Sequence, residues 1–162
     1  MPEASVTTRT RSALALGAFT GAVASAAAVG AVSQPDRWYR SLKKPPFNPP
    51  PAVFPPVWTA LYGLMAVSAW RVWRKPKSPE RTAALALWAG QLGLNAAWSW
   101  IFFARRRPGA ALVDLLGLHG FISAYLAKAR KVDRAAAWML APYLAWVSFA
   151  GLLNEEIVRR NR

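Results

Sequence analysis

Three side chains that can hydrogen bond or stack recur on one side of a long apolar run. Gln91, Asn95 and Trp98 are spaced i, i+4 and i+7, which places them on one face of a helix. Amide groups in hydrocarbon cost free energy unless they face protein or a cavity, so this face is predicted to point inward. The chemistry available to it is hydrogen bonding and stacking, either between helices alone or toward a ligand.

Two other apolar runs carry a comparable set of aromatic residues. Trp58 and Tyr62 are four residues apart and therefore share a helical face. In the last apolar run, Tyr143, Trp146 and Ala150 fall on one stripe. Aromatic rings supply a large contact area with a defined geometry, so we expect these stripes to line the same interior site.

The sequence offers few groups for acid–base, nucleophilic or metal chemistry. It contains no Cys, which excludes disulfides, thiolate nucleophiles and Cys-based metal sites. Asp114 lies inside an apolar run, where it must point inward, pair or take up a proton. A structural hydrogen bond is the simpler interpretation and a catalytic role is the alternative. His119 lies near the middle of the same run; packing is its simpler role, and ligation of a porphyrin metal is the alternative. No catalytic residue and no metal ligand is therefore assigned.

Five apolar runs must position these residues, and each is built around a window free of Lys and Arg. About 20 apolar residues suffice to cross a bilayer as a helix. We therefore predict an all-α integral membrane protein, a bundle of five transmembrane helices that forms one domain over residues 1–162. The spans are expected at about 13–33, 54–73, 82–104, 109–127 and 135–157.

Two of these spans have further predicted features. In the first, Gly17, Gly21 and Ser25 are four residues apart and give a face flat enough for close helix packing. A secretory signal is the alternative for this run, because a basic start precedes an apolar core, but the length of the run favours a span. In the fifth span, Pro142 is predicted to bend the helix.

The charge pattern excludes one obvious class of protein. Hydrophobic residues make up 54% of the chain, yet the formal net charge is +14. A soluble nucleic-acid binder would not keep its cations out of five long windows, so no nucleic-acid partner is expected and the charge is predicted to meet anionic lipid headgroups. Eleven basic residues fall on one side of the predicted membrane and ten on the other. The positive-inside rule needs an excess, so orientation is not predicted.

The connection between the first two spans, residues 34–53, does not resemble a flexible linker. Five prolines lie between Pro45 and Pro51, and such a segment is extended, stiff and partly of polyproline type. It also carries Trp38, Tyr39 and Phe47, which a solvated linker would not need. We interpret the segment as a lid-like cover over a site. The alternative is a loop that rests its aromatic residues at the membrane interface.

The motifs along these runs resemble the TspO/MBR family of tryptophan-rich sensory proteins and translocator proteins. The resemblance extends from about residue 13 to residue 161. It rests on Trp38-Tyr39, Asn48-Pro49-Pro50, Val57-Trp58-Thr59-Ala60-Leu61-Tyr62, Gly90-Gln91-Leu92, Leu94-Asn95, Ala97-Trp98, Pro142-Tyr143-Leu144-Ala145-Trp146 and Leu153-Asn154.

The resemblance implies a dimeric bundle of five transmembrane helices with a pocket near one membrane face, closed by the first connection. It implies protoporphyrin IX, haem or other tetrapyrroles as ligands, with sterols and synthetic benzodiazepine-site compounds as further possibilities; no cofactor is required. By motif, Trp58 and Trp146 match pocket tryptophans linked to porphyrin binding and light-dependent breakdown. Third-span pocket positions are matched by Asn95 and Trp98, and cover and wall positions by Tyr39, Pro49 and Tyr62.

The expected function is therefore a membrane receptor or carrier for tetrapyrroles, active in sensing, transport or scavenging. Light-dependent degradation of porphyrin is one alternative, and lipid or sterol transport is another. The chain departs from the sterol-recognition pattern of mitochondrial relatives, because Glu155 and Glu156 follow Leu153-Asn154 where those proteins have aromatic residues. The expected partners are the hydrophobic ligand, membrane lipid and a second copy of the chain, and the expected location is a bacterial cell envelope.

Overall fold

The computed structural model describes residues 3–33 and 36–162, and the regular structure in these ranges is entirely helical. The predicted all-α class is therefore confirmed. The first two residues of the predicted cover, 34 and 35, lie outside the described ranges. The helices are α1 (Glu3–Val32), α2 (Arg37–Ser41), the 3-10 turn η1 (Pro51–Val53), α3 (Phe54–Trp73), α4 (Pro79–Ser99), the π-turn η2 (Trp100–Ala104), α5 (Pro108–Val132), α6 (Arg134–Met139) and α7 (Ala141–Arg160).

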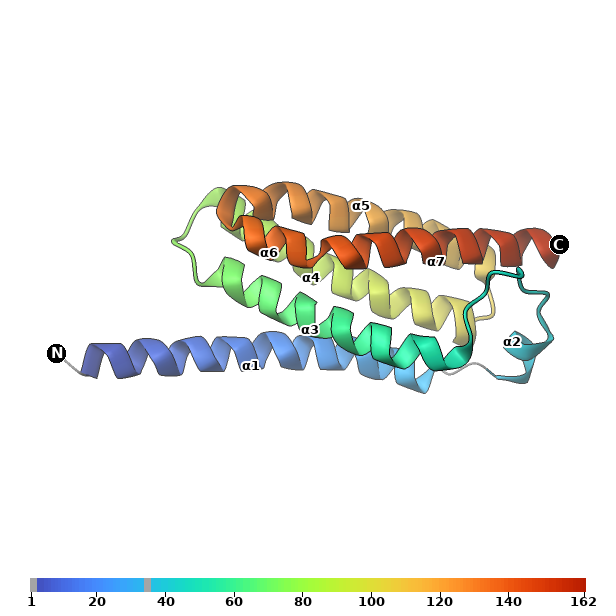
Figure 1. Cartoon of the computed structure of the whole chain (residues 1–162), viewed down its shortest axis with the longest axis horizontal. Helices are drawn as coiled ribbons and strands as arrows, with labels where there is room; N and C mark the ends of the chain where they lie inside the picture. The colour runs from blue at the N-terminus through green and yellow to red at the C-terminus, as the bar shows by residue number, and fades with distance from the viewer. Residues whose placement is uncertain (1–2, 34–35) are drawn as a thin grey trace.

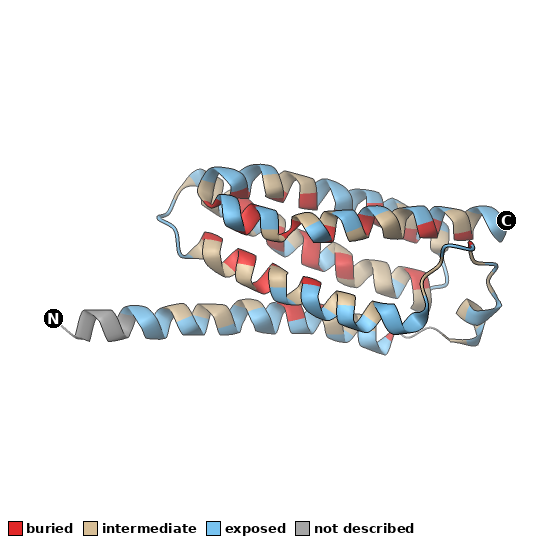
Figure 2. Cartoon of the chain, viewed as in Figure 1, coloured by how far each residue is buried: buried red, intermediate tan, exposed pale blue. Residues whose placement is uncertain are grey.

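The long helices form an elongated bundle (Figure 1). The closest pairs are α4 with α5, α5 with α7, and α1 with α3. The helix α1 lies along one side and extends beyond the others at its amino end, whereas α2 and its flanking loops lie at the opposite end with the carboxyl terminus. Buried positions concentrate between α3, α4, α5 and α7, and α1 is mostly exposed (Figure 2).

Four stretches of helix are long and apolar enough to cross a membrane: Thr8–Val32, Pro51–Trp73, Pro108–Val132 and Arg134–Arg160. The protein is therefore an integral membrane protein. The predicted third span, 82–104, is helical as α4 and η2 but less apolar than the other four. The reason is its content of polar side chains, chiefly Gln91 and Asn95, both of which are buried. The inward orientation predicted for these two residues is confirmed.

The bundle core combines small and large side chains. Fully buried alanines such as Ala69 and Ala111 allow the helices to approach closely, which is how helices associate where no hydrophobic effect drives them together. A buried polar contact ties α3 to the last span, because the Ser68 hydroxyl lies 2.6 Å from the Tyr125 hydroxyl and donates to the Ala136 carbonyl at 2.7 Å. Both hydroxyls are therefore hydrogen-bonded, as buried polar groups in proteins usually are.

Asp133 organises the connection between α5 and α6. Its buried carboxylate accepts the Ala136 N–H at 3.0 Å and so caps α6. It also forms ion pairs with Arg71 at 3.0 Å and Lys75 at 3.4 Å, both on or just after α3. Burial acts to raise the pKa of Asp133, but the Ala136 N–H and the two cations outweigh it and lower this pKa below its usual value.

The last predicted span is broken. The helix α6 ends at Met139 and α7 starts at Ala141, so Pro142 lies in a first helical turn, where its missing N–H needs no acceptor. The predicted bend is thus an interruption of one residue, the buried Leu140, between two helices of the same apolar stretch.

The helix α4 ends in an unusual turn. The Arg105 N–H bonds to the Trp100 carbonyl at 2.9 Å, and Arg106 has a φ of 53°, a conformation that side chains other than glycine rarely adopt. The Arg106 guanidinium forms an ion pair with Asp36 at 2.7 Å, so this strained position faces the start of the first connection.

The small-residue face predicted on α1 packs against no other helix of the described chain. Gly17, Gly21 and Ser25 are all exposed, and a Cβ atom added to either glycine would meet nothing within 4 Å. The face therefore points away from the bundle of its own chain. Instead, α1 contacts the bundle through residues such as Val23 and Ala26, which are buried.

Candidate functional site

Four aromatic side chains from α3 and α7 gather where these two helices face each other. Trp58 is at the centre, with its ring stacked on Tyr62 at a centroid distance of 5.2 Å. The Tyr143 ring meets Trp58 edge-on at 6.2 Å, and Trp146 does so at 6.5 Å. We call these four residues the aromatic group. Because they lie four apart on α3 and three apart on α7, ordinary helical geometry turns both pairs toward the helix interface.

The aromatic group is tied to α4 through Asn95. The Tyr62 hydroxyl donates to Asn95 Oδ1 at 3.1 Å, and Asn95 Nδ2 donates to the Tyr143 hydroxyl at 3.0 Å. Asn95 is only 3% exposed and Tyr143 is fully buried. A buried amide that bridges two hydroxyls fixes the orientation of both rings, so this part of the site is preorganised.

Trp98, one α4 turn beyond Asn95, belongs to a neighbouring layer of the site. Its indole N–H donates to Asn154 Oδ1 at 3.3 Å, and Asn154 Nδ2 donates to the Pro108 carbonyl at 2.7 Å. Its ring packs against Phe102, with centroids 5.3 Å apart. The predicted pocket position is therefore also a structural link between α4, α5 and α7.

Residues 36–53, which we call the covering segment, lie at the end of the bundle that holds the carboxyl terminus (Figure 1). The Tyr39 ring packs edge-on against Phe102 and Phe103, at 6.0 and 5.3 Å. Burial raises the pKa of the Tyr39 phenol. Farther along, the Phe47 ring lies 6.4 Å from that of Phe149 on α7. The aromatic residues that suggested a cover in the sequence thus rest on side chains of the bundle.

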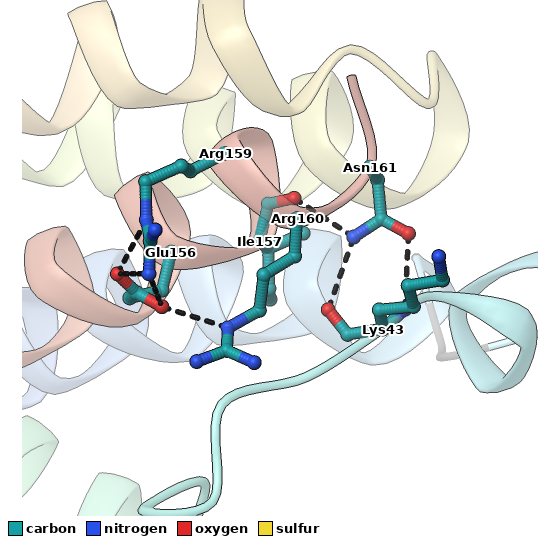
Figure 3. A network of polar contacts seen from close by, with 6 residues as sticks. All are labelled: Lys43, Glu156, Ile157, Arg159, Arg160 and Asn161. Carbon is teal, nitrogen blue, oxygen red and sulfur yellow. Dashed lines mark hydrogen bonds and ion pairs between the residues drawn. The ribbon is translucent and has the colours of Figure 1, made fainter.

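The carboxyl end of α7 holds the middle of the covering segment (Figure 3). Asn161 Oδ1 accepts the Lys43 N–H at 3.0 Å, and Asn161 Nδ2 donates to the Lys43 carbonyl, also at 3.0 Å. We call this pair of bonds the Asn161 clasp. Nearby, Glu156 binds Arg159 and Arg160 with contacts of 2.7 Å each. One amide side chain therefore joins two segments that are 118 residues apart in the sequence.

The start of the covering segment is held by charge. Asp36 accepts the Tyr39 N–H at 3.0 Å and pairs with Arg106 at 2.7 Å. The Tyr39 N–H and the Arg106 guanidinium lower the pKa of Asp36 below its usual value. Of the cations near the site, Lys44 is used within the segment itself, because its amine lies 4.5 Å from the centre of the Tyr39 ring and donates to the Arg40 and Leu42 carbonyls.

The remaining predicted residues are placed less centrally. Ala150 is half-buried against the main core, next to the aromatic group. Pro49 is half-buried within the covering segment, where its carbonyl accepts the Asn48 side-chain amide at 3.0 Å. His119 is exposed on α5, so it does not point into the bundle. Among the residues that the structure describes, no cluster of His, Cys, Asp and Glu is arranged to hold a metal ion.

Three side chains carry buried polar atoms without a partner. Both side-chain amide atoms of Gln91, Oδ2 of Asp114 and Nε of Arg71 are buried and make no hydrogen bond within the described ranges. The structural hydrogen bond expected for Asp114 is thus not formed at this oxygen. Unpaired polar atoms are costly, so Gln91 on α4 and Asp114 on α5 are polar positions whose hydrogen-bonding demand the described contacts leave unmet.

Two site residues were missed by sequence reasoning. Phe54 contacts Trp146 at 5.8 Å, and Phe149 also contacts Trp146 at 5.8 Å. Phe54 precedes Trp58 by four residues and Phe149 follows Trp146 by three, so helical spacing was the signal that would have identified them. With them, the aromatic group extends without interruption to the covering segment.

Comparisons with known proteins agree with the resemblance drawn from the motifs. The model of the TspO/MBR family matches residues 13–160. The chain is 43% identical to a translocator protein of Bos taurus over 128 residues, 78% of this chain and 76% of that protein. It is 38% identical to a tryptophan-rich sensory protein of Cereibacter sphaeroides over 143 residues, covering 88% and 89%. It is 39% identical to the protein CrtK of Rhodobacter capsulatus over 141 residues, covering 86% and 88%.

Proposed function

The chain belongs to the TspO/MBR family of membrane proteins, and from this premise we propose that it binds a tetrapyrrole such as protoporphyrin IX or haem. The ligand would lie against Trp58 and Trp146 beneath the covering segment. The protein would act in tetrapyrrole sensing, transport or scavenging.

The observation that carries this proposal is the aromatic group itself. Trp58 and Trp146 meet with an interplanar angle of 88°, and each has a further aromatic neighbour. Perpendicular rings offer both a face and an edge to a flat macrocycle, which is the geometry that aromatic surfaces prefer. Both side chains are only half-buried, so part of each ring remains accessible to a ligand.

We expect polar groups on both sides of the aromatic group to anchor the ligand. Asn95 bridges Tyr62 and Tyr143 on the inner side, and a ligand with ring nitrogens can exchange hydrogen bonds with this network. On the outer side, Arg40 and Lys43 are exposed on the covering segment. Two cations at the mouth suit the propionate groups of a porphyrin, because charge-assisted hydrogen bonds are the stronger kind.

We also propose that the polypeptide crosses the membrane five times, with α4 and η2 as the additional span. Together they run from Pro79 to Ala104, about 39 Å at 1.5 Å per residue, which exceeds the hydrocarbon thickness of roughly 30 Å. The polar side chains that lower the apolarity of this stretch, Gln91 and Asn95, are buried within the protein. A polar residue that faces protein does not prevent a helix from spanning.

One test is a titration of purified protein with protoporphyrin IX in the dark, followed by illumination. Saturable binding by the parent, with weaker binding by Trp146→Ala, is expected. A matched control is Trp138→Ala, because Trp138 is 60% exposed and lies on α6, outside the aromatic group. Equal dark affinities for the parent and both variants would refute the proposed site.

The illuminated arm of the same experiment addresses the second candidate, light-dependent breakdown of the pigment. Trp58 and Trp146 lie in ring contact at the proposed site, which favours photochemistry between indole and pigment. Loss of the porphyrin spectrum in light and dioxygen, slower in Trp146→Ala at equal occupancy, is the expected sign of it. A porphyrin spectrum that does not change in light would argue against breakdown of the pigment and leave tetrapyrrole binding as the proposed function.

The sterol alternative is disfavoured by the end of α7. Glu156 forms ion pairs with Arg159 and Arg160 (Figure 3). Glu155 is exposed. This charged cluster occupies the place where mitochondrial relatives were expected to carry aromatic residues. We therefore expect sterol to compete poorly with protoporphyrin IX.

A further inference from the structure

A cavity lies at the end of the molecule opposite the covering segment, between the start of α1 and the end of α3. Its volume is about 660 Å³, within the range of about 300–1,000 Å³ that is usual for ligand sites. Its lining combines three arginines, two tryptophans and small or aliphatic residues: Thr8, Arg9, Arg11, Ser12, Ala13, Leu16, Trp70, Trp73 and Arg74. The aromatic group and the covering segment contribute nothing to it.

The cavity lies at the membrane boundary. Arg9 and Arg11 precede the part of α1 that is free of charged residues, and Arg71 and Arg74 lie at the end of α3, so the charged flanks of two apolar helices meet at this level. Tryptophan and arginine are favoured there, the first because its ring is amphipathic and the second because its long stem reaches toward the headgroups. Residues of α1 form one wall of the cavity, and residues at the end of α3 form the other. The amino end of α1 extends beyond α3 in this region (Figure 1).

Two contacts make the inner wall rigid. The Trp70 indole N–H donates to the Ser12 carbonyl at 3.0 Å and to the Ser12 hydroxyl at 3.1 Å, which ties α3 to α1. The Arg74 guanidinium lies 4.6 Å from the centre of the Trp70 ring. A stacked guanidinium keeps its N–H groups available at its edge, so Arg74 is positioned to donate to an anion.

The charge of the cavity is uncompensated. Within the described ranges, Arg9, Arg11 and Arg74 form no ion pair with an acidic side chain. A smaller cavity of about 350 Å³ near α4 differs in this respect, because Glu80 lines it together with its lysines and it has no aromatic wall. Three unpaired guanidiniums beside an apolar, aromatic surface call for an anion with an apolar tail.

We propose that this cavity is a binding site for an anionic phospholipid. The phosphate lies between Arg9, Arg11 and Arg74, and the start of the acyl chains lies along Leu16 and Trp73. Arginine suits this role because its planar fork matches phosphate oxygens in pairs. The bound lipid joins α1 to α3 at this boundary. Among the described contacts, the only hydrogen bonds that already link these two helices are those between Trp70 and Ser12.

The test measures lipid retention by native mass spectrometry of the full chain in detergent. Dioleoylphosphatidylglycerol and dioleoylphosphatidylcholine are titrated against the parent and against Arg9→Gln/Arg11→Gln/Arg74→Gln. The parent should prefer the anionic lipid, and the triple variant should lose this preference by at least about tenfold, since each cation near an anionic surface contributes roughly a fivefold factor.

A matched control removes the same charge from the same end of the bundle. Lys128, Arg130 and Arg134 are exposed around the α5–α6 connection, and none of them lines the cavity or forms an ion pair in the described part of the chain. Lys128→Gln/Arg130→Gln/Arg134→Gln should retain the parental preference. Equal loss in both triple variants would show that overall charge, not the cavity, attracts the lipid, and would overturn the proposal.

Two further outcomes decide the nature of the ligand. Equal retention of both lipids by the parent would overturn the proposal without any variant. Inorganic phosphate at millimolar concentration is added to the lipid-loaded parent as a separate arm. Retention of phosphatidylglycerol supports a lipid site, whereas its displacement would show that the cavity binds free phosphate and that the acyl chains contribute nothing.

Discussion

Replacing Asn161 with Ala should loosen the covering segment while leaving the bundle intact. The substitution removes both bonds of the Asn161 clasp to Lys43, each of 3.0 Å. It also removes a bond from the Asn161 amide to the Ile157 carbonyl at 2.8 Å. Because α7 ends at Arg160, Asn161 lies outside the helix, and its loss removes no helical backbone bond.

The magnitude follows from the two clasp bonds. A hydrogen bond contributes about 0.5–1.5 kcal/mol net, and water competes with exposed bonds such as these, so each is taken near the lower end. Together they favour the closed segment by about 1–2 kcal/mol, a factor of roughly 5–30 in the population of the open state. The ring contacts of Tyr39 and Phe47 with the bundle remain, so the segment opens more often but is not released.

Two assays measure this effect. Limited proteolysis without ligand should cleave the covering segment of Asn161→Ala roughly 5–30-fold faster than that of the parent, because cleavage follows the open population. Stopped-flow release of protoporphyrin IX should accelerate by a similar factor if the segment must open first. The control is Arg162→Ala, which changes an exposed neighbouring residue outside the clasp. Parental cleavage rates in Asn161→Ala would refute the reasoning, whatever the ligand does.

Three further predictions concern other parts of the molecule. Trp146→Phe should bind protoporphyrin IX more tightly than Trp146→Ala in a fluorescence titration, since loss of the aromatic face costs about 1–3 kcal/mol by analogy with base stacking; indistinguishable affinities would contradict this. Replacing the five prolines between Pro45 and Pro51 with Gly and Ser should leave the circular dichroism helical but accelerate ligand release and proteolysis, because a flexible segment loses more entropy on closing; unchanged release would make the segment a mere connector. Asp133→Ala should lower stability by about 1–3 kcal/mol in thermal unfolding, and Asp133→Asn by less, because Asn still caps α6. Since the folded-state pKa of Asp133 is lowered, its contribution persists above pH 3.8, the ordinary value, and is lost as pH falls through the folded-state pKa; a loss near neutral pH would contradict this assignment.

Helical spacing and the cost of polar groups in hydrocarbon were enough to predict the centre of the candidate site. Asn95 was predicted to face protein, and the stripes of Trp58 and Trp146 were predicted to line one interior site. In the structure Asn95 accepts a hydrogen bond from Tyr62, and the rings of Trp58 and Trp146 are in contact. The same reasoning explains why α4 is not among the four stretches that are apolar enough to span a membrane by composition. Its buried amides are tolerated because other helices surround them.

Other features depend on tertiary geometry that no local pattern encodes. The Asn161 clasp joins residues 118 positions apart, and a single amide near a chain end carries no periodic signal. The outward direction of Gly17 and Gly21 depends on which side of α1 meets α3, and a smooth face is compatible with either choice. His119 is ambiguous for the same reason, because its position along the span says nothing about its direction.

The exposed position of α1 has a consequence for how the protein is made. This helix precedes the other described helices along the chain, and its contacts are with α3 and α4. At about 5–20 residues per second, roughly 2–8 seconds separate the translation of Val32 from that of Trp73, where α3 ends. During this interval neither partner of α1 is complete, and its internal backbone bonds satisfy its own polar groups in the bilayer. Its small-residue face meets no neighbour of the same chain even afterwards, so α1 stays the least buried of the four apolar stretches.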